Sequence, residues 1–184
     1  YTYWTNLPPG SILPILKKMK DVRFKGVATI TGYKAHHVAG KFGFEYFTTD
    51  YREILNDKDI NLVFIMTRHG FHARLVTEAL KAGKHVFVEK PLCINESQLQ
   101  EIISVYKQIH QKNQTNEITE INETYDKKQT NKTNQIDQIL VVGFNRRFAP
   151  TTRFVLERLA LIERPLIATV RVNVGYIPQE SWVH

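Results

Sequence analysis

Glu89 and Lys90 stand side by side after the apolar segment Val86–Val88, and Pro91 follows them. An acid and a base at the end of a buried strand cost free energy unless they pair or face a solvated cleft. A lysine in a partly desolvated cleft can take part in proton transfer. Pro91 favours extended backbone at Lys90. A salt-bridged strand end is one interpretation, and a position at a ligand-binding edge favours the other, a functional lysine.

A second polar segment, residues 67–72, reads Thr-Arg-His-Gly-Phe-His and follows the apolar run Leu62–Met66. It leads directly into a predicted helix. The start of a helix offers free N–H groups that suit a phosphate or a ribose. The hydroxyl of Thr67 can donate a further hydrogen bond. Helix capping with a surface histidine explains the segment equally well.

A third polar segment, residues 143–148, reads Gly-Phe-Asn-Arg-Arg-Phe and follows the apolar residues Ile139–Val142. If this segment is extended, Arg146 and Arg147 point in opposite directions. One arginine could then reach a cleft while the other is solvated. For one of the two, a basic surface turn is the expected role.

The elements that position these segments alternate along the chain. Helical spacing of apolar residues predicts helices, and continuous apolar runs predict strands buried on both faces. Glycines placed to end helices and an acid at capping-box spacing support the boundaries. Such repeats imply right-handed crossovers and a parallel α/β sheet, with ligands beyond the carboxyl ends of its strands. We predict strands over residues 24–30, 62–66, 85–89, 139–143 and 166–174, helices over 12–19, 33–42, 71–82, 96–109 and 151–162, helix-ending glycines at Gly43 and Gly83, and a short helix capped by Asp50 with Glu53.

Composition excludes several classes of protein. The chain has 184 residues, of which 42% are hydrophobic and 23% charged, as in a globular protein. No apolar run approaches the roughly 18 residues of a membrane span, and no secretory signal is visible. The lone Cys93 excludes an internal disulfide and a cysteine-based metal site, and it fits a cytoplasmic location.

The distribution of charge and the spacing of the histidines limit the kinds of partner that we expect. The net charge of +7 is spread over both ends of the chain rather than gathered in one block, so we expect no nucleic-acid partner. The seven histidines show no metal-binding spacing, so we expect no metal. Local binding of an anion is the better interpretation of any basic cluster.

Residues 110–138 interrupt the alternation. They are rich in Asn, Gln, Thr and Lys and poor in apolar residues. Such a segment cannot bury enough apolar surface to offset the entropy of ordering it. We predict a disordered insertion that follows a helix ending near Ile109. A partner-binding loop is the alternative.

Four stretches together carry a resemblance to a known family: TTDYREIL (48–55), NLVFIMTRHGFHARLVTEALKAGKHVFVEKPL (61–92), VGFNRRFAP (142–150) and RVNVGYIPQESWVH (171–184). In this order they resemble the Gfo/Idh/MocA family of NAD(P)-dependent oxidoreductases, and most closely members that act on sugars or nucleotide sugars, including those of polysaccharide biosynthesis. The resemblance implies a Rossmann-like domain followed by an α+β domain with an open antiparallel sheet. It also implies hydride transfer at a secondary alcohol carbon.

The resemblance assigns roles to individual residues. In the family, the lysine of the Glu-Lys-Pro motif lies beside the nicotinamide and the reacting carbon, which implies that Lys90 is catalytic and also contacts the cofactor. Further contacts with the cofactor, or for the last two with the cofactor or substrate, are implied for Thr67, His69, His72, Glu89, Asn145 and Arg147.

Two departures from the family pattern concern the ends of the chain. None of the nine glycines forms G-x-G-x-x-G, and residues 1–10 stand where the first strand and its phosphate loop belong. No acid follows Ile30, so the choice between NAD and NADP stays open. We expect residues 1–149 to form an incomplete NAD(P)-binding domain and residues 150–184 to begin the α+β domain.

Two functions stay open on the sequence alone. The first is an oxidoreductase of this family, present as a fragment, that uses NAD or NADP on a sugar-like or polyol substrate and associates into homo-oligomers. The second is a non-catalytic remnant or a partner-binding Rossmann-like module. Because the phosphate loop is missing, we expect the 184 residues alone to bind dinucleotide weakly and to turn over nothing.

Overall fold

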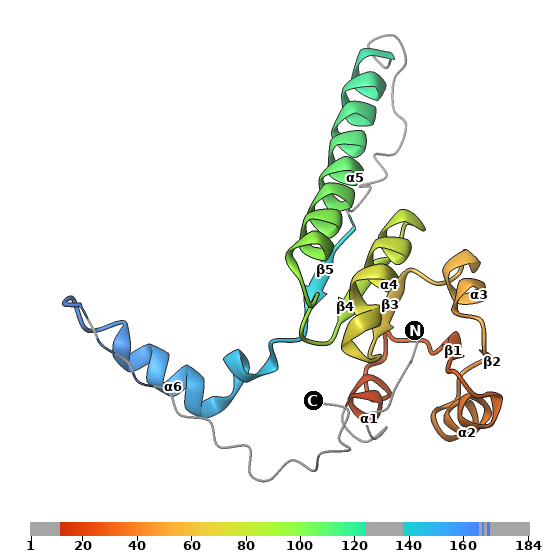
Figure 1. The fold of residues 1–184 in the computed structure, drawn as a ribbon, viewed down its shortest axis with the longest axis horizontal. Helices are drawn as coiled ribbons and strands as arrows, with labels where there is room; N and C mark the ends of the chain where they lie inside the picture. Colours follow the sequence, from red (N-terminus) through yellow and green to blue (C-terminus); the bar gives the residue numbers. More distant parts are fainter. Residues whose placement is uncertain (1–11, 124–137, 166, 168, 170–184) are drawn as a thin grey trace. The chain divides into compact units, whose positions relative to one another are not determined.

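The computed structural model describes residues 12–123, 138–165, 167 and 169 (Figure 1). Its contacts divide the chain into two units, one up to Phe144 and one from Asn145. The expected strand over residues 166–174 falls almost wholly outside the described residues. The first unit contains α1 (Leu13–Leu16), β1 (Gly26–Ala28), α2 (Gly32–Phe42), β2 (Tyr46–Thr48), α3 (Tyr51–Asn56), β3 (Leu62–Ile65), α4 (His69–Lys81), β4 (His85–Val88), α5 (Glu96–Glu123) and β5 (Leu140–Val142), and the second contains a short 3₁₀ helix (Asn145–Phe148) and α6 (Pro150–Leu159).

All strand pairs among the described residues are parallel, which confirms the predicted α/β class. The strands form a pair, β1–β2, and a trio in the order β3–β4–β5. In a doubly wound fold with the order 3-2-1-4-5-6, such a pair and trio occupy positions 3-2 and 4-5-6. The position between β1 and β3 therefore belongs to the first strand of the fold. No strand among the described residues takes it, and residues 1–10, which the sequence assigns to that place, lie outside the description.

Strand β3 shows why the apolar run 62–66 is continuous. Successive side chains of a strand point to opposite faces. Val63 and Ile65 belong to one core cluster, and Phe64 and Met66 belong to another. The first cluster is completed by residues of α3, α4, α5 and β4, and the second by residues of α1, α2 and β1. The prediction of a sheet covered on both faces is thus confirmed.

Two helices end at the glycines that the sequence predicted as helix ends. Gly43 ends α2 with φ of 84°, and its N–H donates to the carbonyl of Ala39 at 2.8 Å. Gly83 follows α4 with φ of 75°. These left-handed values are ones that glycine adopts without a steric cost.

The start of α3 is fixed by Asp50, as predicted. Its carboxylate accepts a hydrogen bond from the N–H of Arg52 at 2.9 Å. The N–H of Asp50 itself donates to the hydroxyl of Thr48 at 3.0 Å. In a capping box, the side chain of Glu53 would accept the hydrogen bond from the N–H of Asp50. Here the hydroxyl of Thr48 accepts it instead.

Helix α5 is longer than the sequence predicted. The predicted end near Ile109 is wrong, because the helix continues through residues 110–123, which were expected to be disordered. These residues contain many good helix formers and no glycine or proline, and a helix satisfies its own backbone hydrogen bonds without a core. Figure 1 shows this part of α5 running well past the sheet. Residues 124–137 of the expected insertion lie outside the description.

A buried lysine, which the sequence patterns did not single out, organises the loop between α3 and β3. Lys84 is only 6% exposed. Its Nζ donates to the carbonyl of Asp57 at 2.6 Å and to that of Ile60 at 2.7 Å. Burial lowers the pKa of Lys84, and the negative charge of Asp57 partly opposes that shift. The carbonyl of Asp57 also accepts from the N–H of Ile60 at 3.2 Å, so Lys84 adds a second donor to that side of the loop.

Gly26 is the position in β1 where a side chain has no room. A Cβ atom there would lie 2.5 Å from Cδ1 of Ile54 and 2.6 Å from Cζ of Tyr46. We expect Gly26→Ala to lower the free energy of unfolding by about 1–3 kcal/mol through overpacking. Gly40→Ala in α2 is the matched control, since nothing lies within 4 Å of its Cβ position. It should leave stability unchanged or raise it by up to about 1 kcal/mol.

Urea unfolding of both variants, followed by circular dichroism, checks this prediction. Equal stability of the two variants would show that β1 does not pack against Ile54 and Tyr46 as described.

Candidate functional site

The carboxyl ends of β3 and β4 come out together at one edge of the sheet. Ile65 of β3 lies opposite Val88 of β4, and the N–H of Glu89 donates to the carbonyl of Ile65 at 2.9 Å. The segments that follow the two strands therefore emerge side by side. The structure thus brings the predicted residue Thr67 close to Glu89 and Lys90, as a parallel sheet requires.

His72 connects these two segments. Its ring lies in the first turns of α4 and is 0% exposed. Nδ1 is 2.7 Å from the carbonyl oxygen of Pro91, and Nε2 is 3.0 Å from that of Thr67. Each ring nitrogen thus faces one carbonyl oxygen; a neutral imidazole donates to one of the two, and an imidazolium donates to both. Because the ring is buried beneath both loops, this geometry gives His72 a positioning role, and its implied contact with a cofactor stays a prediction.

His69 lies at the first position of α4, two residues earlier than the sequence predicted for the helix start. Its ring centroid is 5.7 Å from that of His72, with the rings nearly edge to face. Burial lowers the pKa of His69, and the neighbouring positive charges of His72 and Lys90 lower it further. The neutral form of the ring is therefore favoured, and in that form the ring can accept as well as donate a hydrogen bond.

Glu89 and Lys90 differ in their surroundings. Glu89 is half-buried, and its Oε2 accepts a hydrogen bond from the backbone N–H of Lys90 at 3.2 Å. The side chain of Lys90 is exposed at the edge of the sheet. The peptide bond between Lys90 and Pro91 is cis. An acceptor and an exposed cationic donor are thus presented at the same strand end.

Gly143 allows the end of β5 to approach Glu89. Its N–H donates to the carbonyl of Val88 at 2.8 Å. A Cβ atom at Gly143 would lie 3.3 Å from the carboxyl carbon of Glu89 and 3.2 Å from the ring of Phe87. Gly143 was expected at a strand end, but its contact with Glu89 was not predicted. The sequence does contain a hint of it, because a glycine directly follows β5, the strand that pairs with β4.

Asn145 and Arg147 belong to the second unit of the chain. They lie in the 3₁₀ helix Asn145–Phe148, where the guanidinium of Arg147 packs over the ring of Phe148 at 5.4 Å. The segment is not extended, so the argument that Arg146 and Arg147 point in opposite directions fails. The implied places of Asn145 and Arg147 beside the cofactor stay predictions.

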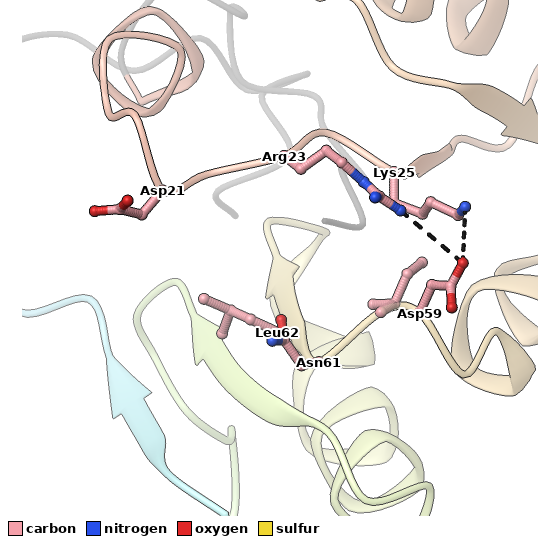
Figure 2. Close-up of a pocket in the computed structure, with 7 residues that line it drawn as sticks. Asp21, Arg23, Lys25, Asp59, Asn61 and Leu62 are labelled. Carbon is pink, nitrogen blue, oxygen red and sulfur yellow. Dashed lines mark hydrogen bonds and ion pairs between the residues drawn. The ribbon is translucent and has the colours of Figure 1, made fainter.

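A pocket of about 360 Å³ lies at the opposite, amino edge of the strands. Its walls are the segments that lead into β1 and β3. Figure 2 shows Arg23 and Lys25 converging on Asp59. Lys25 Nζ is 3.1 Å from Asp59 and 3.0 Å from Glu45, and these bonds raise the pKa of Lys25. Because its cations are already paired and ligands of such sheets bind at the carboxyl edge, this pocket is not the candidate site.

The described residues offer neither a membrane span nor a metal site. In those ranges no helix is both long and apolar enough to cross a membrane. No cluster of three or more His, Cys, Asp or Glu residues there is arranged to hold a metal ion. Cys93 is half-buried and packs against the first core cluster, as the packing role of a lone cysteine requires.

Comparison with known proteins identifies relatives of the chain. Residues 10–117 match the Gfo/Idh/MocA family model, described as an oxidoreductase family with an NAD-binding Rossmann fold. The uncharacterised oxidoreductase YrbE of Bacillus subtilis is 27% identical over 73% of this chain and 32% of its own length. Levoglucosan dehydrogenase of Pseudarthrobacter phenanthrenivorans is 37% identical over 57% of this chain and 24% of its own length.

Solved structures agree on the fold. Scyllo-inositol dehydrogenase from Lactobacillus casei superposes with a TM-score of 0.62 at 20% identity, covering 86% of this chain and 40% of that one. The 3-ketoreductase KijD10 from Actinomadura kijaniata superposes with a TM-score of 0.59 at 22% identity, covering 80% of this chain and 38% of that one.

The chain spans about a quarter to a third of the length of the curated relatives described above. The family model nevertheless covers more than half of the chain, including the strand ends that carry Thr67, Glu89 and Lys90. The resemblance carried by those segments is therefore confirmed. The chain belongs to the Gfo/Idh/MocA family of oxidoreductases.

Proposed function

We propose that this chain forms the cofactor-binding part of an enzyme that moves a hydride between NAD or NADP and a secondary alcohol carbon of a polyol or sugar-like substrate. Family membership supports the redox chemistry. Relatives named for levoglucosan and inositol support the substrate class, since both compounds are rings that carry several hydroxyls. The observation that carries the proposal is the placement of Lys90 beside the loop of Thr67, fixed through His72.

The residues at the carboxyl edge fit the nicotinamide end of a dinucleotide. Thr67 offers a hydroxyl, Glu89 a carboxylate and Lys90 an ammonium group, and Gly143 keeps the backbone bare beside Glu89. These are the donors and acceptors that ribose hydroxyls and an amide need. The diphosphate would need N–H groups of a glycine-rich loop, and the described residues do not include one.

Lys90 is the residue of this chain that can move a proton at the substrate. When bound, the nicotinamide accepts or returns the hydride. As an alcohol carbon loses its hydride, the hydroxyl proton must leave the oxygen, and the amine of Lys90 is placed to take it. In the reverse direction the ammonium group returns that proton. Glu89 fixes the backbone of Lys90 through its bond to the N–H, so it orients the lysine without taking the proton itself.

Replacing Lys90 should affect turnover and leave the fold intact. We expect Lys90→Met to lower kcat by about 10²–10⁴-fold, the typical contribution of a positioned acid or base. Because the side chain is exposed, stability should change by less than about 0.5 kcal/mol. The measurement is cofactor reduction with a panel of cyclic polyols, using the polypeptide that the natural gene encodes.

Lys81→Met is the matched control, because Lys81 is an exposed lysine in the last turn of α4. It should leave kcat unchanged. Full activity of Lys90→Met would remove the lysine from the mechanism, and no activity of the unmodified protein with any polyol or cofactor would favour a non-catalytic module.

Replacing His72 should disturb both loops at once. His72→Phe leaves the carbonyls of Thr67 and Pro91 buried without a donor, so we expect the free energy of unfolding to fall by about 1–3 kcal/mol. His72→Gln retains an N–H donor and should recover part of that loss. The control is His37→Phe, on the exposed face of α2, which should change stability by less than about 0.5 kcal/mol.

Urea unfolding measures these changes, and the separate effects on kcat and KM test the positioning role. If His72→Phe leaves stability and both kinetic constants unchanged, the two carbonyl bonds do not hold the loops.

A further inference from the structure

The carboxyl end of β1 is a third strand end at the same edge as the candidate site. The turn that follows it is held by the hydroxyl of Thr29, which is buried and donates to the carbonyl of Thr31 at 2.7 Å. Thr31 has extended backbone, and its side chain makes no capping bond to α2. Its hydroxyl therefore remains available to a ligand at this edge.

The side chains beyond this turn are open to solvent. Tyr33 is 83% exposed, and Lys34 next to it is also exposed. An exposed aromatic ring beside a strand end is suited to stacking on a nucleotide base. A lysine one residue further on brings a cationic donor to the same surface.

No carboxylate lies in this part of the chain. Residues 26–42, which span β1, the turn and α2, include no Asp or Glu. The next acids along the chain are both engaged elsewhere. Glu45 pairs with two basic residues at the amino edge. Asp50 caps α3 through the N–H of Arg52 at 2.9 Å, with the guanidinium of Arg52 at 3.9 Å.

This distribution of charge bears on which dinucleotide the fold accepts. In doubly wound dinucleotide-binding folds, an acid near this strand end accepts hydrogen bonds from the adenosine ribose of NAD, whereas a nearby basic residue accommodates the 2′-phosphate of NADP. A carboxylate would repel that phosphate. Here Thr31 stands in place of the acid, and Lys34 supplies the positive charge.

We propose that the segment Thr31–Lys34 binds the 2′-phosphate of NADP, so that the protein prefers NADP to NAD. The Thr31 hydroxyl and the Lys34 ammonium group donate to the phosphate, and Tyr33 lies against the adenine. This inference rests on the proposed function, because it concerns the cofactor of that same enzyme. It names the form of the cofactor, which family membership leaves open.

The test uses nucleotides that contain only the adenosine end of the cofactor, so neither a phosphate loop nor turnover is needed. Adenosine 2′,5′-bisphosphate and adenosine 5′-monophosphate are titrated into the 184-residue chain by isothermal calorimetry. We expect the bisphosphate to bind at least about ten-fold more tightly, the ratio that one charge-assisted hydrogen bond supplies. Thr31→Asp should abolish that preference, and Lys34→Gln should reduce it about ten-fold while leaving the affinity for the monophosphate unchanged.

Lys41→Gln is the matched control, since it removes the same charge from the last turn of α2. It should leave the preference intact. Equal binding of the two nucleotides, or an equal loss in Lys34→Gln and Lys41→Gln, overturns the inference and leaves the proposed oxidoreductase function standing. Failure of both nucleotides to bind also overturns the inference, whereas the proposed function is tested separately, by the activity of the polypeptide that the natural gene encodes.

Discussion

The buried ring of His72 is the constraint on which the candidate site depends. It spans the carbonyls of Thr67 and Pro91, and thereby joins the loop after β3 to the loop after β4. The ring holds the carbonyl of Pro91, and Lys90 directly precedes that residue in the chain. The ring also holds the carbonyl of Thr67. A single buried side chain thus sets the spacing of the residues proposed to act on substrate and cofactor.

The parallel sheet makes this arrangement possible by separating its two edges. The carboxyl ends of β1, β3 and β4 carry hydroxyls, an exposed lysine and half-buried polar groups. The amino edge instead carries Arg23 and Lys25, which both pair with Asp59 beside a pocket. That pocket lies beside the position of the fold's first strand, between the pair β1–β2 and the trio β3–β4–β5.

Much of the fold could be predicted because the local signals are strong. The run Leu62–Met66 is apolar throughout, since its residues alternate between two core clusters, and Gly43 and Gly83 take left-handed conformations that end helices. The length of α5 could not be predicted from apolar content, because residues 110–123 contain few apolar residues and the helix satisfies its own backbone hydrogen bonds. The burial of His72 could not be predicted, since its two partners lie in loops that only the folded sheet brings together. Lys84 was missed for the same reason, because its carbonyl partners come from a loop distant in sequence.

A crystal structure of the protein bound to NADP would test the central claim most directly, namely that the carboxyl edge of this sheet is the cofactor site. The account predicts that the nicotinamide lies against Thr67 and Lys90, with the 2′-phosphate bound by Thr31 and Lys34 and the ring of His72 buried beneath the loops. Binding of the dinucleotide in the amino-edge pocket beside Lys25 and Asp59, or contact of the nicotinamide with residues away from Lys90, would contradict it.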